Sequence, residues 1–172
     1  MTFRILFTLL IVSTFFSCKD NTLFTKIDAD DSGIQFSNRI IENDSINILD
    51  FEYVYNGSGV GIADFNKDGF QDVFISNGKA GGENNMLYVN QGDGNFTTVT
   101  GDPIVMDNQP SDGATWADMD NDGDIDAFVV NWYGKNNMLY ANNGDGTFEQ
   151  IVDGIAVNDF GYSETAAWGD YD

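Results

Sequence analysis

The sequence predicts an all-β protein made of four-stranded β-propeller blades that repeat about every 52 residues, with an incomplete propeller in this chain. Three observations lead to this prediction. Residues 85–96 return as residues 137–148 with a constant offset of 52. An Asp-rich nonapeptide starts at residue 64, again at residue 118 and, incompletely, at residue 170. The intervening segments are short, rich in Val, Ile, Phe and Tyr, and show no helical periodicity.

Each repeat is expected to contain four short strands in a fixed order. The first strand enters the Asp-rich loop and the second leaves it. A third strand follows, and a Gly-Asp-Gly turn leads to the fourth, because Gly supplies positive φ at no steric cost. Entering strands are expected at residues 61–63, 115–117 and 167–169, and leaving strands at residues 73–76 and 127–130. In the second repeat, the last two strands are expected at residues 138–141 and 147–150.

The repeats divide the chain into three regions. Residues 1–17 form an export signal, residues 18–58 a lead-in segment, and residues 59–172 two blades and the start of a third. In the lead-in, the alternation at residues 34–36 predicts a strand, residues 43–45 predict a loop, and residues 53–55 predict a second strand. We expect this segment to supply a strand to the closing blade of the propeller. Because the third loop stops two ligands in, we also expect that the chain is an N-terminal fragment of a longer protein.

The Asp-rich nonapeptides predict calcium sites. Oxygen-bearing side chains at positions 1, 3, 5 and 9 and a Gly at position 6 make a loop that wraps a hard cation. The expected ligands of the first loop are Asp64, Asn66, Asp68, Asp72 and the carbonyl of Phe70. Those of the second are Asp118, Asp120, Asp122, Asp126 and the carbonyl of Asp124, and a third site begins with Asp170 and Asp172. The second loop has one more ligand carboxylate than the first, so we expect it to bind calcium more tightly.

The sequence argues against three alternatives to a calcium-bound repeat. An EF-hand needs a bidentate Glu at position 12, where this chain has Ile75 or Val129, and its flanks are helical. Asp-rich turns that bind nothing are common, but the same pattern in register argues against coincidence. Magnesium prefers near-ideal octahedra that retain several waters. We therefore expect calcium to stabilise the fold by binding the native state.

Composition excludes several functional classes. The net charge is −21, from 28 acidic and 7 basic residues, so no basic patch exists for nucleic acid. The chain has no His, which removes the commonest general base and imidazole metal sites. The clustered acids are already accounted for as ion ligands, and no separate acid pair stands out. We therefore expect the chain not to be an enzyme.

The N-terminus predicts export. Arg4 precedes an apolar run over residues 5–16, which is too short to span a bilayer as a helix but suits a signal peptide. The run ends at Ser17 and Cys18, and this resembles a bacterial lipoprotein signal in which Cys18 is lipidated. Lys19 and Asp20 resemble short signals that send some bacterial lipoproteins to the cell surface. We expect an outer-membrane or cell-surface lipoprotein whose membrane contact is the lipid on Cys18; simple secretion is the alternative.

Aromatic residues near the loops have two interpretations. Trp116 and Trp168 precede the second and third loops and are expected to pack between blades, with a ligand platform as the alternative. Trp132 and Tyr133 follow a strand and lie closer to a loop, where they would either be incidental surface residues or contact a partner.

Taken together, these motifs resemble a known family. The loops with their Gly-Asp-Gly-x-Phe turns look like FG-GAP/VCBS repeats, the blades of integrin α-subunit-type propellers, and residues 116–126 match closely. Residues 32–36 and 59–64 are also similar to the start of exported bacterial proteins of the cartilage-acidic-protein-like (ASPIC/UnbV) group. The resemblance implies a calcium-stabilised, cell-surface propeller that acts in adhesion or recognition of an extracellular protein or glycan. The alternatives are an accessory domain of a larger extracellular polysaccharide-active enzyme and a structural spacer.

Overall fold

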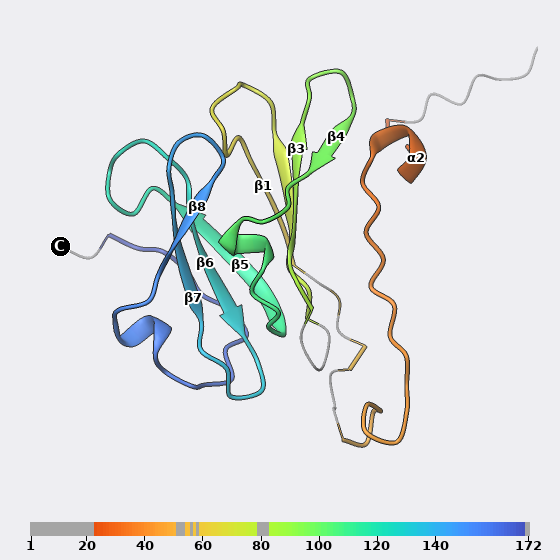
Figure 1. Ribbon diagram of the computed structural model, residues 1–172, viewed down its shortest axis with the longest axis vertical. Helices are drawn as coiled ribbons and strands as arrows, with labels where there is room; N and C mark the ends of the chain where they lie inside the picture. Colours follow the sequence, from red (N-terminus) through yellow and green to blue (C-terminus); the bar gives the residue numbers. More distant parts are fainter. Residues whose placement is uncertain (1–22, 51–53, 56, 58, 79–82, 171–172) are drawn as a thin grey trace, which may run out of the picture.

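The computed structural model describes residues 23–50, 54, 55, 57, 59–78 and 83–170, which form two four-stranded antiparallel sheets in which neighbouring strands follow chain order (Figure 1). The first sheet contains β1 (Val60–Ala63), β2 (Asp72–Ile75), β3 (Met86–Asn90) and β4 (Phe96–Thr98). The second contains β5 (Ser111–Ala117), β6 (Asp126–Asn131), β7 (Met138–Asn142) and β8 (Phe148–Ile151). Each sheet is followed by a short 3₁₀ helix, Pro103–Val105 and Ile155–Val157 respectively. The prediction of all-β, four-stranded blades is confirmed, but residues 167–169, predicted as the entering strand of a third blade, form no strand.

The Gly-Asp-Gly turns join the third and fourth strands of each sheet, as the sequence predicts. Gly92 and Gly94 have φ of 78° and 92°, and Gly144 and Gly146 have φ of 80° and 81°. These values lie in the left-handed region, which Gly adopts without steric cost. The two turns are therefore the same local structure built twice.

Trp116 packs between the two sheets, as predicted. Its ring centroid lies 4.5 Å from that of Phe65 and 5.1 Å from that of Phe74 in the first sheet. It also lies 6.5 Å from the ring of Phe148 in the second. The indole covers Gly61 of β1, where a methyl group would collide with it. The shared core is therefore an interface between blades.

Within the described residues, the two sheets are separate and do not close into a barrel. In the first sheet, the side chains of Val60 and Ile62 of β1 are exposed. In the second sheet, the ring of Phe128 in β6 contacts that of Trp168 at a centroid distance of 6.4 Å, and Trp168 is 39% exposed. This contact repeats, one blade later, the contact between Trp116 and Phe74. The described residues thus form two neighbouring blades of an incomplete propeller.

The lead-in segment differs from the prediction in one respect. A single helical turn, α2 (Ala29–Ser32), precedes a stretch that runs along the first sheet on the side of β4 (Figure 1). Residues 34–40 alternate between half-buried and exposed, as predicted for a strand, but they form no strand ladder. The strand prediction at residues 34–36 is therefore wrong: side chains alternate in burial along this stretch, but its backbone forms no ladder with a neighbouring strand. Gly33 lies close to the Phe96 backbone, which places the segment at the sheet edge.

The remaining predictions for the N-terminal region have mixed outcomes. Residues 43–46 form a turn, which confirms the predicted loop. Tyr53 lies outside the described residues, whereas Val54 and Tyr55 belong to a turn, so the second predicted strand is wrong where it is described. The signal at residues 1–17, Cys18 and Asp172 also lie outside the described residues. Within the described part of the chain, none of the helices has the length and apolar character needed to cross a membrane.

Candidate metal centre

The first Asp-rich loop joins β1 to β2 and folds inward around its own carboxylates. Asp64 accepts hydrogen bonds from the backbone N–H of Asp68 at 3.1 Å and of Gly69 at 2.8 Å. The loop reverses through Lys67 and Gly69, whose φ values are 58° and 91°. Asp68 in turn accepts from the N–H of Phe70 at 2.8 Å. This geometry explains the Gly at position 6, because a side chain is disfavoured at such a φ.

The second loop, between β5 and β6, repeats the hydrogen bonds from backbone N–H groups to carboxylates that the first loop makes. Asp118 accepts from the N–H of Asp122 at 3.1 Å and of Gly123 at 3.0 Å. Asn121 and Gly123 have φ of 63° and 87°. Asp122 accepts from the N–H of Asp124 at 2.9 Å. Two loops with different intervening residues thus adopt one conformation.

The ninth-position carboxylates anchor the loops to the sheets. Asp72 is buried and accepts from the N–H of Phe65 and of Asn90, each at 2.9 Å. Asp126 is buried and accepts from the N–H of Met119 and of Asn142, each at 2.8 Å. Each of these carboxylates therefore joins the start of its loop to the end of the third strand.

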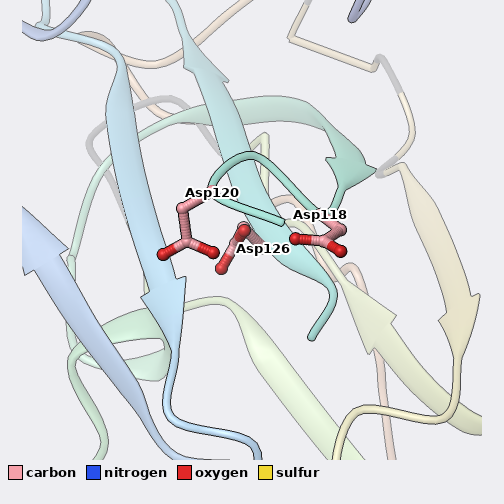
Figure 2. A group of neighbouring side chains, drawn as sticks. All are labelled: Asp118, Asp120 and Asp126. Carbon is pink, nitrogen blue, oxygen red and sulfur yellow. The ribbon is translucent and has the colours of Figure 1, made fainter. Parts of the chain in front are cut away.

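In the second loop, carboxylate oxygens of Asp118, Asp120 and Asp126 lie within 4.8 Å of one another. Figure 2 shows the three side chains gathered at the loop that joins β5 to β6. Negative charges this close repel one another, and a set of hard oxygen ligands of this kind suits a calcium ion. In the first loop the third position is Asn66, whose amide donates to Asp68 at 2.9 Å. Among the described residues, the donor set of the second loop thus fits a hard divalent cation.

Charge and burial shift the pKa values of groups in both loops. Burial raises the pKa of Asp72, with the charges of Asp68 and Asp64 adding to the effect and two backbone hydrogen bonds opposing it. Burial, followed by the charge of Asp122, raises the pKa of Asp120. In both cases burial is the main cause of the raised pKa, and the charges of neighbouring carboxylates add to it. A bound cation would reverse this effect.

The seventh position faces a different neighbour in each loop. The Phe70 ring packs against Gly92 of the adjacent Gly-Asp-Gly turn. The Asp124 side chain packs against Gly144 and forms an ion pair with Lys67, which belongs to the first loop. The hydrogen bond to Asp124 raises the pKa of Lys67, with partial burial opposing it. The carbonyl ligand role of positions 70 and 124 stays a prediction, as does that of Asp170, which is exposed.

At the opposite end of the blades lies a repeated polar cluster that sequence reasoning missed. Asn85 accepts from the N–H of Asn77 at 2.8 Å and donates to Asp107 at 2.7 Å and to Ser111 at 3.2 Å. Burial raises the pKa of Asp107 to about 6, against the hydrogen bonds from Asn85 and Ser111. The same contacts recur one repeat later: Asn137 accepts from the N–H of Asn131 at 2.9 Å and donates to Asp159 at 3.0 Å and Ser163 at 2.9 Å. Each cluster links the second and third strands of one blade to the start of the next.

Two further residues near the loops had no predicted role. Asn90 and Asn142 end the third strands and hold the ninth-position carboxylates through their backbone N–H groups. Lys67 carries the cross-blade ion pair. In the sequence, Asn90 recurs as Asn142 and Asn85 recurs as Asn137, each at an offset of 52. This repetition was the available signal for these roles, but strand propensity does not explain why Asn is used at these positions. Lys67 has no repeated counterpart, because the second loop carries Asn121 there.

Trp132 and Tyr133 contact each other and Tyr162, with centroid distances of 5.7 to 6.5 Å and near-perpendicular rings. They form an aromatic cluster between the second blade and the chain that follows it. Their role toward a partner stays a prediction.

Comparison with known proteins agrees with the repeat geometry. A family model described as FG-GAP-like repeat matches residues 64–129 and residues 118–172, which together span more than half of the chain. Each match begins at the first Asp of one of the two loops described above. A comparison with curated proteins finds no match.

Proposed function

Because the chain belongs to the FG-GAP-like repeat family, we propose that it is an exported, calcium-binding β-propeller protein of the cell surface that acts in adhesion to, or recognition of, a protein or glycan. The observation that carries the calcium proposal is the second loop, where three carboxylates converge within 4.8 Å. The first loop supports it by repeating the same backbone conformation with the same internal bonds.

The side chains at positions 1, 3, 5 and 9 would hold the ion in each loop. These are Asp64, Asn66, Asp68 and Asp72 in the first loop and Asp118, Asp120, Asp122 and Asp126 in the second. When bound, the ion supplies positive charge that offsets carboxylate repulsion. The protein's own contribution is to aim these oxygens inward, which the left-handed residues at positions 4 and 6 accomplish. The proposed role is structural, because both loops join the first two strands of a blade.

Recognition is proposed at the end of the second blade away from the ion loops. A hollow of about 380 Å³ lies there, and its lining includes Lys135, Asn136, Met138, Gln150 and Phe160. Amide groups beside an exposed apolar ring suit both sugars and peptides, since they offer directional hydrogen bonds and a stacking surface. Binding residues are commonly carried by loops on a rigid scaffold. We propose binding rather than catalysis, because the clustered acids are used within the ion loops.

Export and lipidation are proposed from the N-terminal sequence alone. The apolar run ends at Cys18, so metabolic labelling with a fatty-acid analogue should mark the wild-type protein and leave Cys18→Ser unlabelled. Labelling of both proteins, or of neither, would contradict lipidation at this residue.

The calcium proposal is tested by calorimetric titration of the chain with calcium, followed by thermal unfolding in calcium and in excess chelator. We expect two sites and a lower melting temperature in chelator. An unchanged melting temperature would contradict a structural role for the ion.

The recognition proposal needs a separate experiment. Binding to a glycan array and to surface-protein extracts is measured for the wild type and for Phe160→Asn. This change keeps a residue suited to the φ of 49° and installs the Asn found at the equivalent position, Asn108, of the first blade. The matched control is Phe24→Asn, which alters another exposed ring, in the lead-in segment. Loss of binding only in Phe160→Asn supports recognition at the hollow, whereas equal binding by all three proteins contradicts it.

A further inference from the structure

The first ion loop touches the second blade at three points. The carbonyl of Phe65 accepts a hydrogen bond from the side-chain amide of Asn142 at 2.9 Å. Asn66 lies against Gly146, where an added methyl carbon would come within 3.0 Å of the Asn66 Cβ. Lys67 forms its ion pair with Asp124. Three consecutive residues of the first loop therefore contact the second blade, at the end of β7, at the turn that follows it and at the second loop.

One of these contacts lies on a short path between the two ion loops. The N–H of Phe65 donates to Asp72, the ninth-position carboxylate of the first loop, at 2.9 Å. The carbonyl of Phe65 accepts from Asn142, whose own N–H donates to Asp126, the ninth-position carboxylate of the second loop, at 2.8 Å. All four residues are at most 4% exposed. One residue on each side of the blade interface thus connects the two carboxylates.

The bond across the blades is additional to the local role of Asn142. Its equivalent, Asn90, has the same local contacts: its N–H donates to Asp72 at 2.9 Å and its side-chain amide donates to the carbonyl of Gln71 at 3.0 Å. Asn142 likewise donates to the carbonyl of Ile125 in its own loop at 3.2 Å. Among the described residues, however, it is Asn142 whose amide also reaches the loop of the other blade.

From these contacts we propose that the two loops bind calcium as a coupled pair, with Asn142 as the residue that transmits the coupling and Lys67 as a second contact. The proposal rests on the calcium function proposed above. An ion in the first loop fixes Asp72 and, through it, the Phe65 peptide. Asn142 is then held in the position in which it supports Asp126, so the second ion orders a loop that is already partly ordered.

The sign of the coupling follows from this ordering. The first ion bears part of the entropy cost of fixing both loops, and the second ion binds to a more rigid site. Repulsion between the two ions opposes this effect. The second loop carries five Asp residues, however, so its net charge stays negative even after one divalent ion has bound there. Lys67 joins the two loops through its ion pair with Asp124. We therefore expect positive cooperativity.

The experiment is a set of calcium titrations by calorimetry on the whole chain. Asp68→Ala disables the first site and Asp122→Ala disables the second, and neither change removes a residue of the path. In each variant the remaining site should bind at least about fivefold more weakly than in the wild type, which is the lower end of typical coupling between sites. Reciprocity requires the same factor in both directions.

The role of Asn142 is isolated by a matched pair of variants. In the Asn142→Ala background, disabling the first site with Asp68→Ala should lower the affinity of the second site by a clearly smaller factor than it does in the wild-type background, because the contact through Lys67 remains. In the Asn90→Ala background, which removes the equivalent local bonds, the coupling factor should persist. If Asn142→Ala fails to fold by circular dichroism, Lys67→Met replaces it and should reduce the coupling factor.

The outcomes separate the two proposals. No calcium binding by the wild type would overturn the proposed function itself. Binding to two sites whose affinities are unaffected by disabling the other would retain that function and overturn the coupling. A coupling factor that is undiminished in both Asn142→Ala and Lys67→Met would overturn the assigned path.

Discussion

Replacing Asp126 by Asn separates the two roles that the structure gives to this carboxylate. Asp126 is 1% exposed and accepts two backbone hydrogen bonds of 2.8 Å. The amide keeps the shape but turns one acceptor into a donor that faces an N–H group. Losing one charge-assisted bond and leaving a buried N–H unpaired costs about 2–3 kcal/mol of unfolding free energy, even without calcium. Calcium at about 100 times its dissociation constant adds about 2.7 kcal/mol per site to the wild type. The deficit of the variant should therefore grow to about 5 kcal/mol in calcium.

The assay is urea unfolding of both proteins, in excess chelator and in calcium, followed by Trp fluorescence because Trp116 reports on the blade interface. Asp153→Asn removes an exposed charge outside the loops and controls for net charge. Asp72→Asn is the matched change in the first loop. If the deficit of Asp126→Asn is the same in chelator and in calcium, this carboxylate is not an ion ligand. If no deficit appears in chelator, the reasoning from its hydrogen bonds is wrong.

Three further predictions concern the loops, the polar cluster and the blade interface. The residue at the third loop position can be exchanged between the loops. Asp120→Asn should weaken calcium binding to the second loop about tenfold, and Asn66→Asp should strengthen calcium binding to the first loop about tenfold. Calorimetry measures both affinities, and unchanged affinities would contradict a ligand role for this position. Burial raises the pKa of Asp107 to about 6, above its unfolded value, so folding favours the protonated form and this stability is lost as pH rises through 6. In calcium-free buffer the unfolding free energy should fall by about 2–3 kcal/mol between about pH 4 and pH 7 from this group, and Asp107→Asn should flatten that part of the profile. Gly61→Ala should destabilise the protein by about 1–3 kcal/mol, because the methyl group collides with Trp116; urea unfolding checks this, and wild-type stability would show that the interface tolerates a side chain.

The strand order and the loop conformation were predictable from the sequence because both are local and occur twice. A Gly at position 6 and side-chain oxygens at alternating positions favour the loop conformation locally, through hydrogen bonds within the loop itself. The two copies then constrain each other, since a pattern shared by residues 64–72 and 118–126 excludes most accidental explanations. The strand prediction at residues 34–36 failed for the complementary reason. The alternating pattern at these residues occurs only once in the sequence, with no second copy to test it. A segment that is half-buried along a sheet edge shows the same alternation as a paired strand.

Contacts between repeats were much less predictable. The pairing of Lys67 with Asp124 depends on the rotation between adjacent blades, which no local pattern encodes. Asn85 and Asn142 are repeated at the expected offset, yet the sequence shows only that Asn is used there. Their partners are residues in a neighbouring blade or connection, and those partners become visible only in three dimensions.

The two ends of the blade interface are held by different chemistry, and this difference has a consequence for unfolding. At one end the contacts run through the ion loops, by way of Asn142 and Lys67. At the other end Asn85 joins Asp107 and Ser111 without any group that needs a cation. Removing calcium should therefore loosen the loop end first and leave the Asn85 end closed. Hydrogen exchange in excess chelator should show faster exchange at the loop amides that donate to carboxylates, while the amide of Ser111, which donates to the carbonyl of Asn77, stays protected. Equal acceleration at both ends would mean that the interface opens as one unit and that the two ends are not independent.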